Sequence, residues 1–326
     1  MQKLFHRIVT VLFCLLLCMQ FFSAAPAADI EDEITAFMKE KGLNASNFSL
    51  SYFNLVNGDS YAFNENAYRP IGKLRYLPTH MYFYEEETKG TFDPVVKGAP
   101  EFTISGMTLE ECRYHSIILS EDTVGDKMQA QIGNTIRYLE LINQRYGMQE
   151  PDSLPEEYWN GQVLSADFLM HCIQIVSARS ELYKGMMSNY RMVQTADAFA
   201  DGSVAYPIVQ IRGEADGFIA AVAEVSAPQN FLLVASIKES AGGDEVLGEL
   251  NKLICNYILK SMGETVEEET EASTQSGSPN YYIGEERMAK DSTLTRWLVI
   301  TFSIAGGLSL IGIVIWLIWR AQNRQY

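Results

Sequence analysis

The chain has 326 residues, with 25 basic and 41 acidic side chains, so its formal net charge at pH 7 is −16. This excess of acid excludes nucleic acid as a partner, because phosphates need a basic surface, and it also disfavours docking onto an anionic membrane surface. Apolar residues make up 47% of the chain and charged residues 20%, which excludes intrinsic disorder over most of its length.

Residues 1–27 have the layout of a secretion signal. Lys3 and Arg7 give a basic start, and residues 9–22 form an apolar core that is too short to span a membrane comfortably. Ala25-Pro26-Ala27 then fits the small-residue pattern of a cleavage site. We therefore expect a signal peptide that is removed; the alternative is an uncleaved N-terminal anchor.

Residues 28–262 carry the hydrophobic patterns of an α+β domain. Apolar residues recur with helical spacing near both ends and throughout the middle. They alternate as in a strand at 48–56, and between 206 and 237 they form three β-rich runs that are separated by turn residues. The predicted helices cover 30–41, 74–87, a segment from the capping box at Thr108 to 119, 135–146, 165–176 and 245–261, and the predicted strands cover 48–56, 60–63, 206–212, 218–225 and 231–237. All five strands should form one antiparallel sheet, with the terminal helices on one face and the helical middle on the other.

This segment contains three cysteines, Cys112, Cys172 and Cys255. Three scattered cysteines form neither a disulfide framework nor a zinc pattern, and the histidines show no metal-ligand spacing. We therefore expect no metal and no cofactor. The sequence leaves the state of the three thiols open.

The last part of the chain has the pattern of a tether and a membrane anchor. Residues 263–295 are rich in glutamate, serine, threonine and glycine, so they should form an acidic flexible stalk. The stretch from Trp297 to Trp319 contains no charged residue and is long enough to cross a hydrocarbon core of ~30 Å as a helix. Arg320 and Arg324 follow it, which favours a cytoplasmic end.

The expected organisation is therefore a single-pass protein of the cell membrane, with its domain outside and its C-terminus in the cytoplasm. The expected segments are a signal peptide at 1–27, an extracytoplasmic domain at 28–262, a stalk at 263–295, a transmembrane helix at 296–320 and a cytoplasmic tail at 321–326.

Several segments of the domain resemble those of a known family in their order and in their local sequence. They are the hairpin 51–66 with Asn57-Gly58 at its turn, the helix that follows Leu77-Pro78 up to Gly90, the segment from Thr108-Leu109 to Gly133, the residues 164–167, and the three-strand meander with its terminal helix. This ordered set resembles class A β-lactamases and penicillin-binding-protein-like serine hydrolases over roughly residues 30–261. The resemblance implies a β-lactamase-like α+β fold, in which an antiparallel five-stranded sheet is flanked by helices and joined to an all-helical subdomain.

The resemblance also implies where the catalytic residues should stand. In that family a Ser-x-x-Lys motif at a helix start supplies a nucleophile and a neighbouring amine. Spacing from Leu77-Pro78 places Lys73 at the nucleophile position and Tyr76 at the amine position. No serine or cysteine lies between Ser60 and Ser105, and Thr79 is the nearest candidate hydroxyl.

The two other motifs of the family are degenerate as well. The Ser-x-Asn motif keeps Ser120 but has Asp122 where the amide should stand. The Lys-Thr-Gly motif reads Ile211-Arg212-Gly213, which keeps the glycine and loses the lysine. The resemblance therefore implies the family's fold without its acylating site.

These positions also have simple structural interpretations, which the sequence leaves open. Lys73 and Arg75 fit solvated residues at a helix start, Ser120 fits a cap or turn, and Arg212 fits a solvent-facing strand position. If the residues converge instead, together with the acids at 121–122, they should form a groove of paired charges.

The sequence thus favours a catalytically inactive, membrane-anchored domain that binds or regulates at the cell envelope. Its expected partner is a cell-wall peptide fragment or an envelope protein, with the membrane held through the span from Trp297 to Trp319. One alternative is an active serine hydrolase, of the β-lactamase or cell-wall peptidase type, with relocated catalytic residues. Another is a structural subunit of a membrane complex. The ligand and the oligomeric state stay open.

Overall fold

The computed structural model describes residues 29–92, 102–147, 149–192, 197–201 and 206–263. The expected signal peptide, transmembrane helix and cytoplasmic tail lie outside the described residues, as does the stalk beyond its first residue. Within the described ranges, no helix is both long and apolar enough to cross a membrane.

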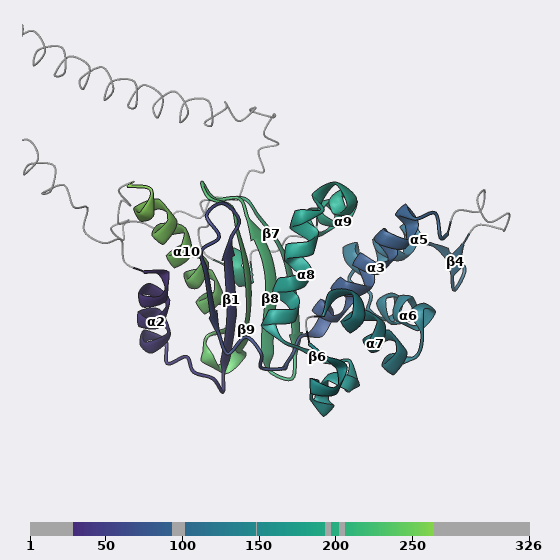
Figure 1. Cartoon of the computed structure of the whole chain (residues 1–326), viewed down its shortest axis with the longest axis horizontal. Coiled ribbons are helices and arrows are strands. Elements are labelled where there is room, and N and C mark those ends of the chain that lie inside the picture. The colour runs from purple at the N-terminus through teal and green to yellow at the C-terminus, as the bar shows by residue number, and fades with distance from the viewer. Residues whose placement is uncertain (1–28, 93–101, 148, 193–196, 202–205, 264–326) are drawn as a thin grey trace, which may run out of the picture. The chain divides into compact units, whose positions relative to one another are not determined.

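A five-stranded antiparallel sheet forms the centre of the domain (Figure 1). Its strands are β1 (Phe48–Asn54), β2 (Ser60–Phe63), β7 (Ile208–Ala215), β8 (Phe218–Val225) and β9 (Phe231–Lys238), in the spatial order β2-β1-β9-β8-β7. The early hairpin joins the late meander through β1 and β9, where Phe48 lies opposite Ile237 and Asn54 opposite Phe231. The predicted mixing of strands from both ends of the chain is therefore confirmed.

Strand β1 ends at Asn54, two residues before the predicted end. The Oδ1 atom of Asn54 accepts hydrogen bonds from the backbone N–H groups of Val56, at 2.9 Å, and Asn57, at 3.2 Å. Those groups are thus used by the turn and not by a sheet neighbour, as is typical of asparagine in turns. Gly58 follows with a φ of 78°, which glycine adopts without strain.

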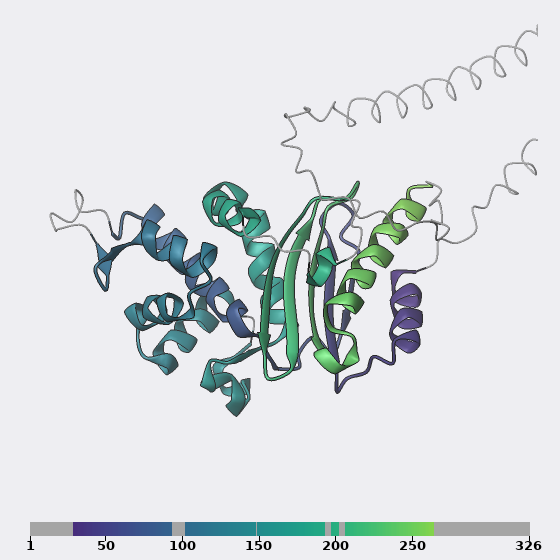
Figure 2. The same ribbon diagram turned by 180° about the vertical axis from the view of Figure 1, so that it is seen from behind.

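The two faces of the sheet are covered by different helices (Figures 1 and 2). Helices α2 (Ile30–Glu40) and α10 (Gly243–Ser261) cover one face, and α8 (Ala166–Ala178), which belongs to the helical layer, packs on the other. Because successive strand residues point to opposite faces, Leu233 packs with α10 while Leu232 and Val234 pack with α8. The predicted division of helices between the two faces is confirmed.

The helical layer begins with a short 3₁₀ helix, η1 (Gly72–Tyr76), which runs into α3 (Leu77–Thr88). The predicted helix starts at residue 74, but the α-helix starts at Leu77. Pro78 explains the difference, because proline lacks an N–H donor and is tolerated in the first helical turn, where that donor has no partner.

The rest of the layer contains two helices that the sequence analysis did not predict, α6 and α9. The capping box at Thr108 is present, but the helix after it changes to a π-helical turn. The longer elements of this part are α5 (Leu109–Arg113), the π-helical turn η2 (Tyr114–Ile118), α6 (Asp122–Ile132), α7 (Thr135–Tyr146) and α9 (Ser180–Met192).

Short elements connect the rest of the described chain. The 3₁₀ helices are η3 (Pro151–Ser153), η4 (Glu156–Asn160), η5 (Ala198–Ala200) and η6 (Glu239–Ala241). Two pairs of short strands are β3 (Arg69–Pro70) with β6 (Val163–Leu164), and β4 (Thr103–Ile104) with β5 (Met107–Thr108).

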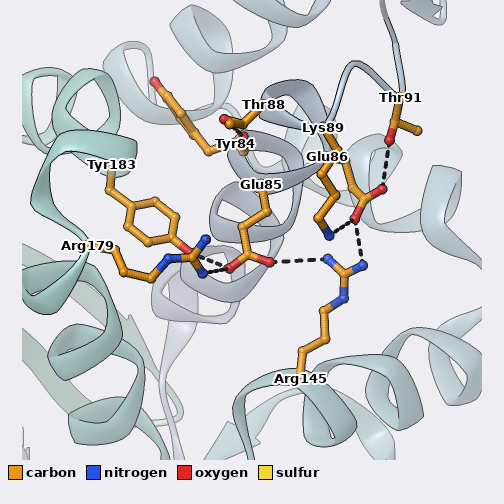
Figure 3. Close-up of polar contacts among 9 residues, drawn as sticks. All are labelled: Tyr84, Glu85, Glu86, Thr88, Lys89, Thr91, Arg145, Arg179 and Tyr183. Carbon is orange, nitrogen blue, oxygen red and sulfur yellow. Dashed lines mark hydrogen bonds and ion pairs between the residues drawn. The ribbon is translucent and has the colours of Figure 1, made fainter.

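Two adjacent glutamates on α3 hold this helix against its neighbours (Figure 3). Glu85 accepts hydrogen bonds from Arg179 at 2.8 Å and from the Tyr183 hydroxyl at 2.5 Å. Arg145 on α7 donates to Glu85 at 3.4 Å and to Glu86 at 2.6 Å. The network therefore fixes α3 to α7 and to the start of α9.

The carboxylate of Glu86 is saturated with donors. Besides Arg145, it accepts hydrogen bonds from Lys89 at 2.8 Å and from Thr91 at 3.0 Å. Burial alone would raise the pKa of Glu86, but the bonds from Lys89, Arg145 and Thr91 outweigh burial and lower this pKa to about 2. Glu86 is therefore charged throughout the physiological pH range.

Candidate binding cleft

A cleft of about 210 Å³ lies where η1, the start of α3, the η2 turn, α9 and β7 meet. Five of the seven positions that the sequence analysis selected line it: Lys73, Tyr76, Ser120, Ile211 and Arg212. Gly213 lies behind η1, and Asp122 starts α6 without lining the cleft. The three degenerate motifs therefore do converge on one cavity.

Two glycines allow the close approach of β7 to η1. A Cβ atom on Gly213 would lie 2.0 Å from the carbonyl oxygen of Ile71. A Cβ atom on Gly72, whose φ is +51°, would lie 2.6 Å from the backbone nitrogen of Glu214. No larger residue fits at either position without moving the backbone. The segment that carries Lys73 is thus held directly against the strand that carries Arg212.

Tyr76, which the resemblance in the sequence places at the amine position, links η1 to α6 through its hydroxyl. Its hydroxyl lies 2.8 Å from Oδ1 of Asp126 and 3.0 Å from the backbone oxygen of Asp122, both on α6, and it accepts a hydrogen bond from Arg75. Burial, followed by the hydrogen bond to Asp126, raises the pKa of Tyr76 well above its ordinary value. A neutral, fully engaged phenol of this kind is a poor general base.

Arg212 is neutralised by carboxylates of the domain itself. Its guanidinium donates to both oxygens of Asp244 at 2.8 Å and pairs with Glu214 at 3.0 Å. These contacts, with Asp244 the largest cause, raise its pKa above the ordinary value. The side chain is 22% exposed and lines the cleft, so Arg212 is only partly open to solvent.

Lys73 and Ser120 remain more open. The side chain of Lys73 is exposed and, within the described part of the chain, makes no hydrogen bond or ion pair. Ser120 is exposed at the end of a turn with a φ of 55°, which fits the turn interpretation. Glu121 pairs with His115 at 3.1 Å and does not line the cleft, so the acidic half of the expected charge groove is Asp197 instead.

Thr79, the nearest candidate hydroxyl in the sequence, is inaccessible. Its side chain is fully buried inside α3, and its Oγ1 lies 2.8 Å from the Tyr138 hydroxyl. The three cysteines are also buried, with free thiols, and burial raises the pKa of each, that of Cys255 to about 12. None of these groups offers a reactive nucleophile to the cleft.

The sequence analysis missed three residues that form the floor of the cleft: His80, Ser116 and Tyr190. Nδ1 of His80 lies 2.6 Å from the Tyr190 hydroxyl, and Nε2 lies 3.0 Å from Oγ of Ser116. His80 stands four residues after Tyr76, the last residue of η1 and the N-cap of α3, so helical spacing indicates that the two side chains point to the same side. No signal of that kind places Tyr190, because its helix α9 was not predicted.

Comparisons with known proteins agree with this arrangement at the level of the fold. No protein-family model matches the sequence, and no curated protein matches it either. The structure is similar to a β-lactamase from Chitinophaga pinensis (13% identity, TM-score 0.56), with 70% of this chain and 99% of that chain covered.

Two further solved structures extend the comparison. A single-residue mutant of PBP-A, described as an acyl-enzyme complex with penicillin G, has 15% identity and a TM-score of 0.57 over 73% of this chain and 100% of its own. A class A β-lactamase representative from Bacteroides cellulosilyticus has 12% identity and a TM-score of 0.55 over 73% of this chain and 100% of its own. The chain thus has the β-lactamase-like α+β fold shared by class A β-lactamases and PBP-A, as the resemblance in its sequence implies.

Proposed function

We propose that this protein is a membrane-anchored, extracytoplasmic binding module with a β-lactamase-like fold, which holds a ligand in its cleft without acylating it. The observation that carries the proposal is the pair Lys73 and Tyr76 at the cleft. Lysine replaces the nucleophilic hydroxyl, and a hydrogen-bonded phenol replaces the neighbouring amine.

The chemistry of acyl transfer supports this proposal. The reaction needs a hydroxyl activated by an adjacent base, close to donors placed for the developing oxyanion. A protonated Lys73 has no lone pair for attack, and the phenol of Tyr76 is neutral because its pKa is raised. Arg212 is bound to Asp244 and is not free to hold the carboxylate of a β-lactam.

The location at the envelope rests on the sequence patterns at both ends of the chain. A secretion signal, an acidic stalk and an uncharged span predict a domain outside the membrane. Protease added to intact cells should release a soluble fragment by cutting within residues 264–295. A fragment that becomes accessible only after lysis would contradict this topology.

The enzymatic claim is tested by hydrolysis of a chromogenic β-lactam. The full-length protein in detergent should hydrolyse it no faster than buffer, while the Chitinophaga pinensis β-lactamase, assayed alongside, shows that the assay detects turnover. Hydrolysis above buffer that survives repurification would contradict the proposal.

One observation favours an active hydrolase with relocated residues as the second candidate. Oγ of Ser116 lies 3.0 Å from Nε2 of His80, which is hydrogen-bonding distance for a nucleophile and its base. Ser116 was not selected from the sequence. Hydrolysis that disappears in Ser116→Ala but persists in Ser120→Ala would establish this candidate.

A further inference from the structure

The floor of the cleft is built from three buried polar side chains that come from three elements. Tyr190 on α9, His80 on α3 and Ser116 in the η2 turn are 5%, 2% and 8% exposed. They form one continuous series of hydrogen bonds, from the phenol through the imidazole to the serine hydroxyl. We call these three residues the floor trio.

The direction of the protons in the floor trio follows from its surroundings. Burial lowers the pKa of His80 to about 3, so its ring is neutral, with one N–H donor and one acceptor nitrogen. Within the described residues, the Tyr190 hydroxyl has no other hydrogen-bond partner. The bond to Tyr190, at 2.6 Å, is the shorter of the two that His80 makes, and hydroxyl donors make shorter hydrogen bonds than N–H donors, so we assign Tyr190 as the donor to Nδ1 of His80.

This direction fixes the rest of the trio. If Nδ1 accepts, Nε2 carries the hydrogen and donates to Oγ of Ser116. The hydroxyl proton of Ser116 then has no acceptor among the described residues and is free for a ligand.

The cleft also contains a cationic side chain, Lys73, that has no partner among the described residues. Arg212 is saturated by Asp244 and Glu214, whereas Lys73 makes no hydrogen bond or ion pair with any described residue. Among the described residues, the cleft therefore offers an ammonium group at Lys73 and, on its buried floor, a hydroxyl proton at Ser116. Successive hydrogen bonds that run in one direction polarise each other, which strengthens Ser116 as a donor.

We propose that Lys73 and Ser116 together hold the carboxylate group of a small ligand in this cleft. This inference rests on the proposed binding function and names its ligand class. Two donors match the two oxygens of a carboxylate, and a bond from a charged donor is the stronger kind.

The charges around the cleft favour a monoanion over a phosphate dianion. Asp197 lines the cleft, and Glu214 and Asp244 lie against Arg212, so three carboxylates surround the one neutralised guanidinium. The whole chain carries a net charge of −16. A second negative charge on the ligand would be repelled by these carboxylates.

The test measures binding of N-acetyl-alanyl-alanine, in its D,D and L,L forms, to the full-length protein in detergent by calorimetry. Each form is compared with its C-terminal amide, which has the same shape without the charge. At least one free acid should bind saturably and roughly ten-fold more tightly than its amide. Inorganic phosphate at the same concentration should compete poorly.

Variants assign the effect to residues. Lys73→Met and Ser116→Ala should each weaken binding of the acid roughly ten-fold and leave binding of the amide nearly unchanged. Lys127→Met is the matched control, because this exposed lysine on α6 does not line the cleft. Lys73 is exposed, so its variant reports on binding even if Ser116→Ala weakens the fold.

The positions of the protons in the floor trio can be measured separately from binding. Nitrogen-15 NMR of the His80 ring, assigned by comparison with His80→Gln, should show the tautomer protonated at Nε2. The Nδ1-protonated tautomer would make Ser116 a donor to His80 and would overturn the inference.

The binding measurements test the carboxylate site itself. No saturable binding, equal affinity for acid and amide, competition by phosphate, or unchanged affinity in Lys73→Met would each overturn it. A failure of this kind without β-lactam hydrolysis refutes the carboxylate site alone, whereas hydrolysis refutes the proposed function itself.

Discussion

The aromatic ring of Tyr76 fills the space that a side chain at position 125 would need. A Cβ atom on Gly125 would lie 2.6 Å from Cε1 of the Tyr76 ring, which is far inside van der Waals contact. Gly125 lies on α6, on the turn that also presents Asp122 and Asp126 to the Tyr76 hydroxyl. The aromatic ring at position 76 therefore fits only because position 125 is a glycine.

This relationship predicts a strong coupling between the two positions. Gly125→Ala should destabilise the protein by about 2 kcal/mol, because overpacking outweighs the helix propensity that alanine gains. The same substitution in a Tyr76→Leu background should cost little or stabilise. Thermal unfolding of the four proteins measures the coupling, with Thr123→Ala as a control at an exposed position of α6. Equal costs in both backgrounds would show that the ring does not occupy this space.

The ion-pair network on α3 should contribute more stability than a surface pair. Arg145→Ala leaves Glu85 and Glu86 short of a donor in a buried place and should cost about 3 kcal/mol. Arg137→Ala, on the same helix, removes a pair with Glu140 at a side chain that is 69% exposed and should cost less than about 1 kcal/mol. Denaturant titration compares them, and similar losses would contradict the structural role of the network.

Glu86 should make stability depend on pH at the acidic end. Its ordinary pKa of 4.5 falls to about 2 in the folded state. A lowered folded pKa contributes stability that is complete above pH 4.5 and is lost as pH falls towards 2. The measurable quantity is the difference in unfolding free energy between the native protein and Glu86→Gln. This difference should shrink over that interval, and a constant difference would contradict the assigned pKa.

His80 should make the stability depend on pH over a higher pH interval than Glu86 does. Burial lowers its pKa from 6.5 to about 3, so the unfolded chain binds a proton there that the folded chain does not. Stability is therefore complete above pH 6.5 and declines as pH falls towards 3, by at most about 1.4 kcal/mol per pH unit. His80→Gln should remove this slope between pH 6 and 4 whatever its effect on absolute stability. An unchanged slope would show that His80 titrates normally.

Much of the fold follows from the sequence because its signals are local and strong. The alternation in β1, the β-rich apolar runs of β8 and β9 and the turn at Asn57-Gly58 can each be recognised without the rest of the chain. Helices α6 and α9 give weaker signals. Helix α6 has only Val124, Gly125 and Met128 buried, and α9 contains Gly185 and other poor helix formers. Tertiary packing, and not local preference, makes these two segments helical.

The candidate site, like the fold, could be predicted only in part from the sequence. Counting from Leu77-Pro78 and from Gly213 led to the cleft. Pro78 marks the start of α3, and Gly213 allows a backbone contact with Ile71 that a Cβ atom would block. The floor trio could not be found in this way. Its members stand 36 and 110 residues apart along the chain, and only the packing of α9 against α3 brings Tyr190 to His80.

The central claim is that the cleft does not acylate, and the mass of the intact protein tests it most directly. The full-length protein is incubated with penicillin G and weighed, and the positive control is the single-residue mutant of PBP-A that is described as an acyl-enzyme complex with this compound. We predict the unmodified mass at every time point while the PBP-A mutant gains one penicillin. A stoichiometric adduct on this protein that is lost in Lys73→Met, Ser116→Ala or Ser120→Ala would contradict the account.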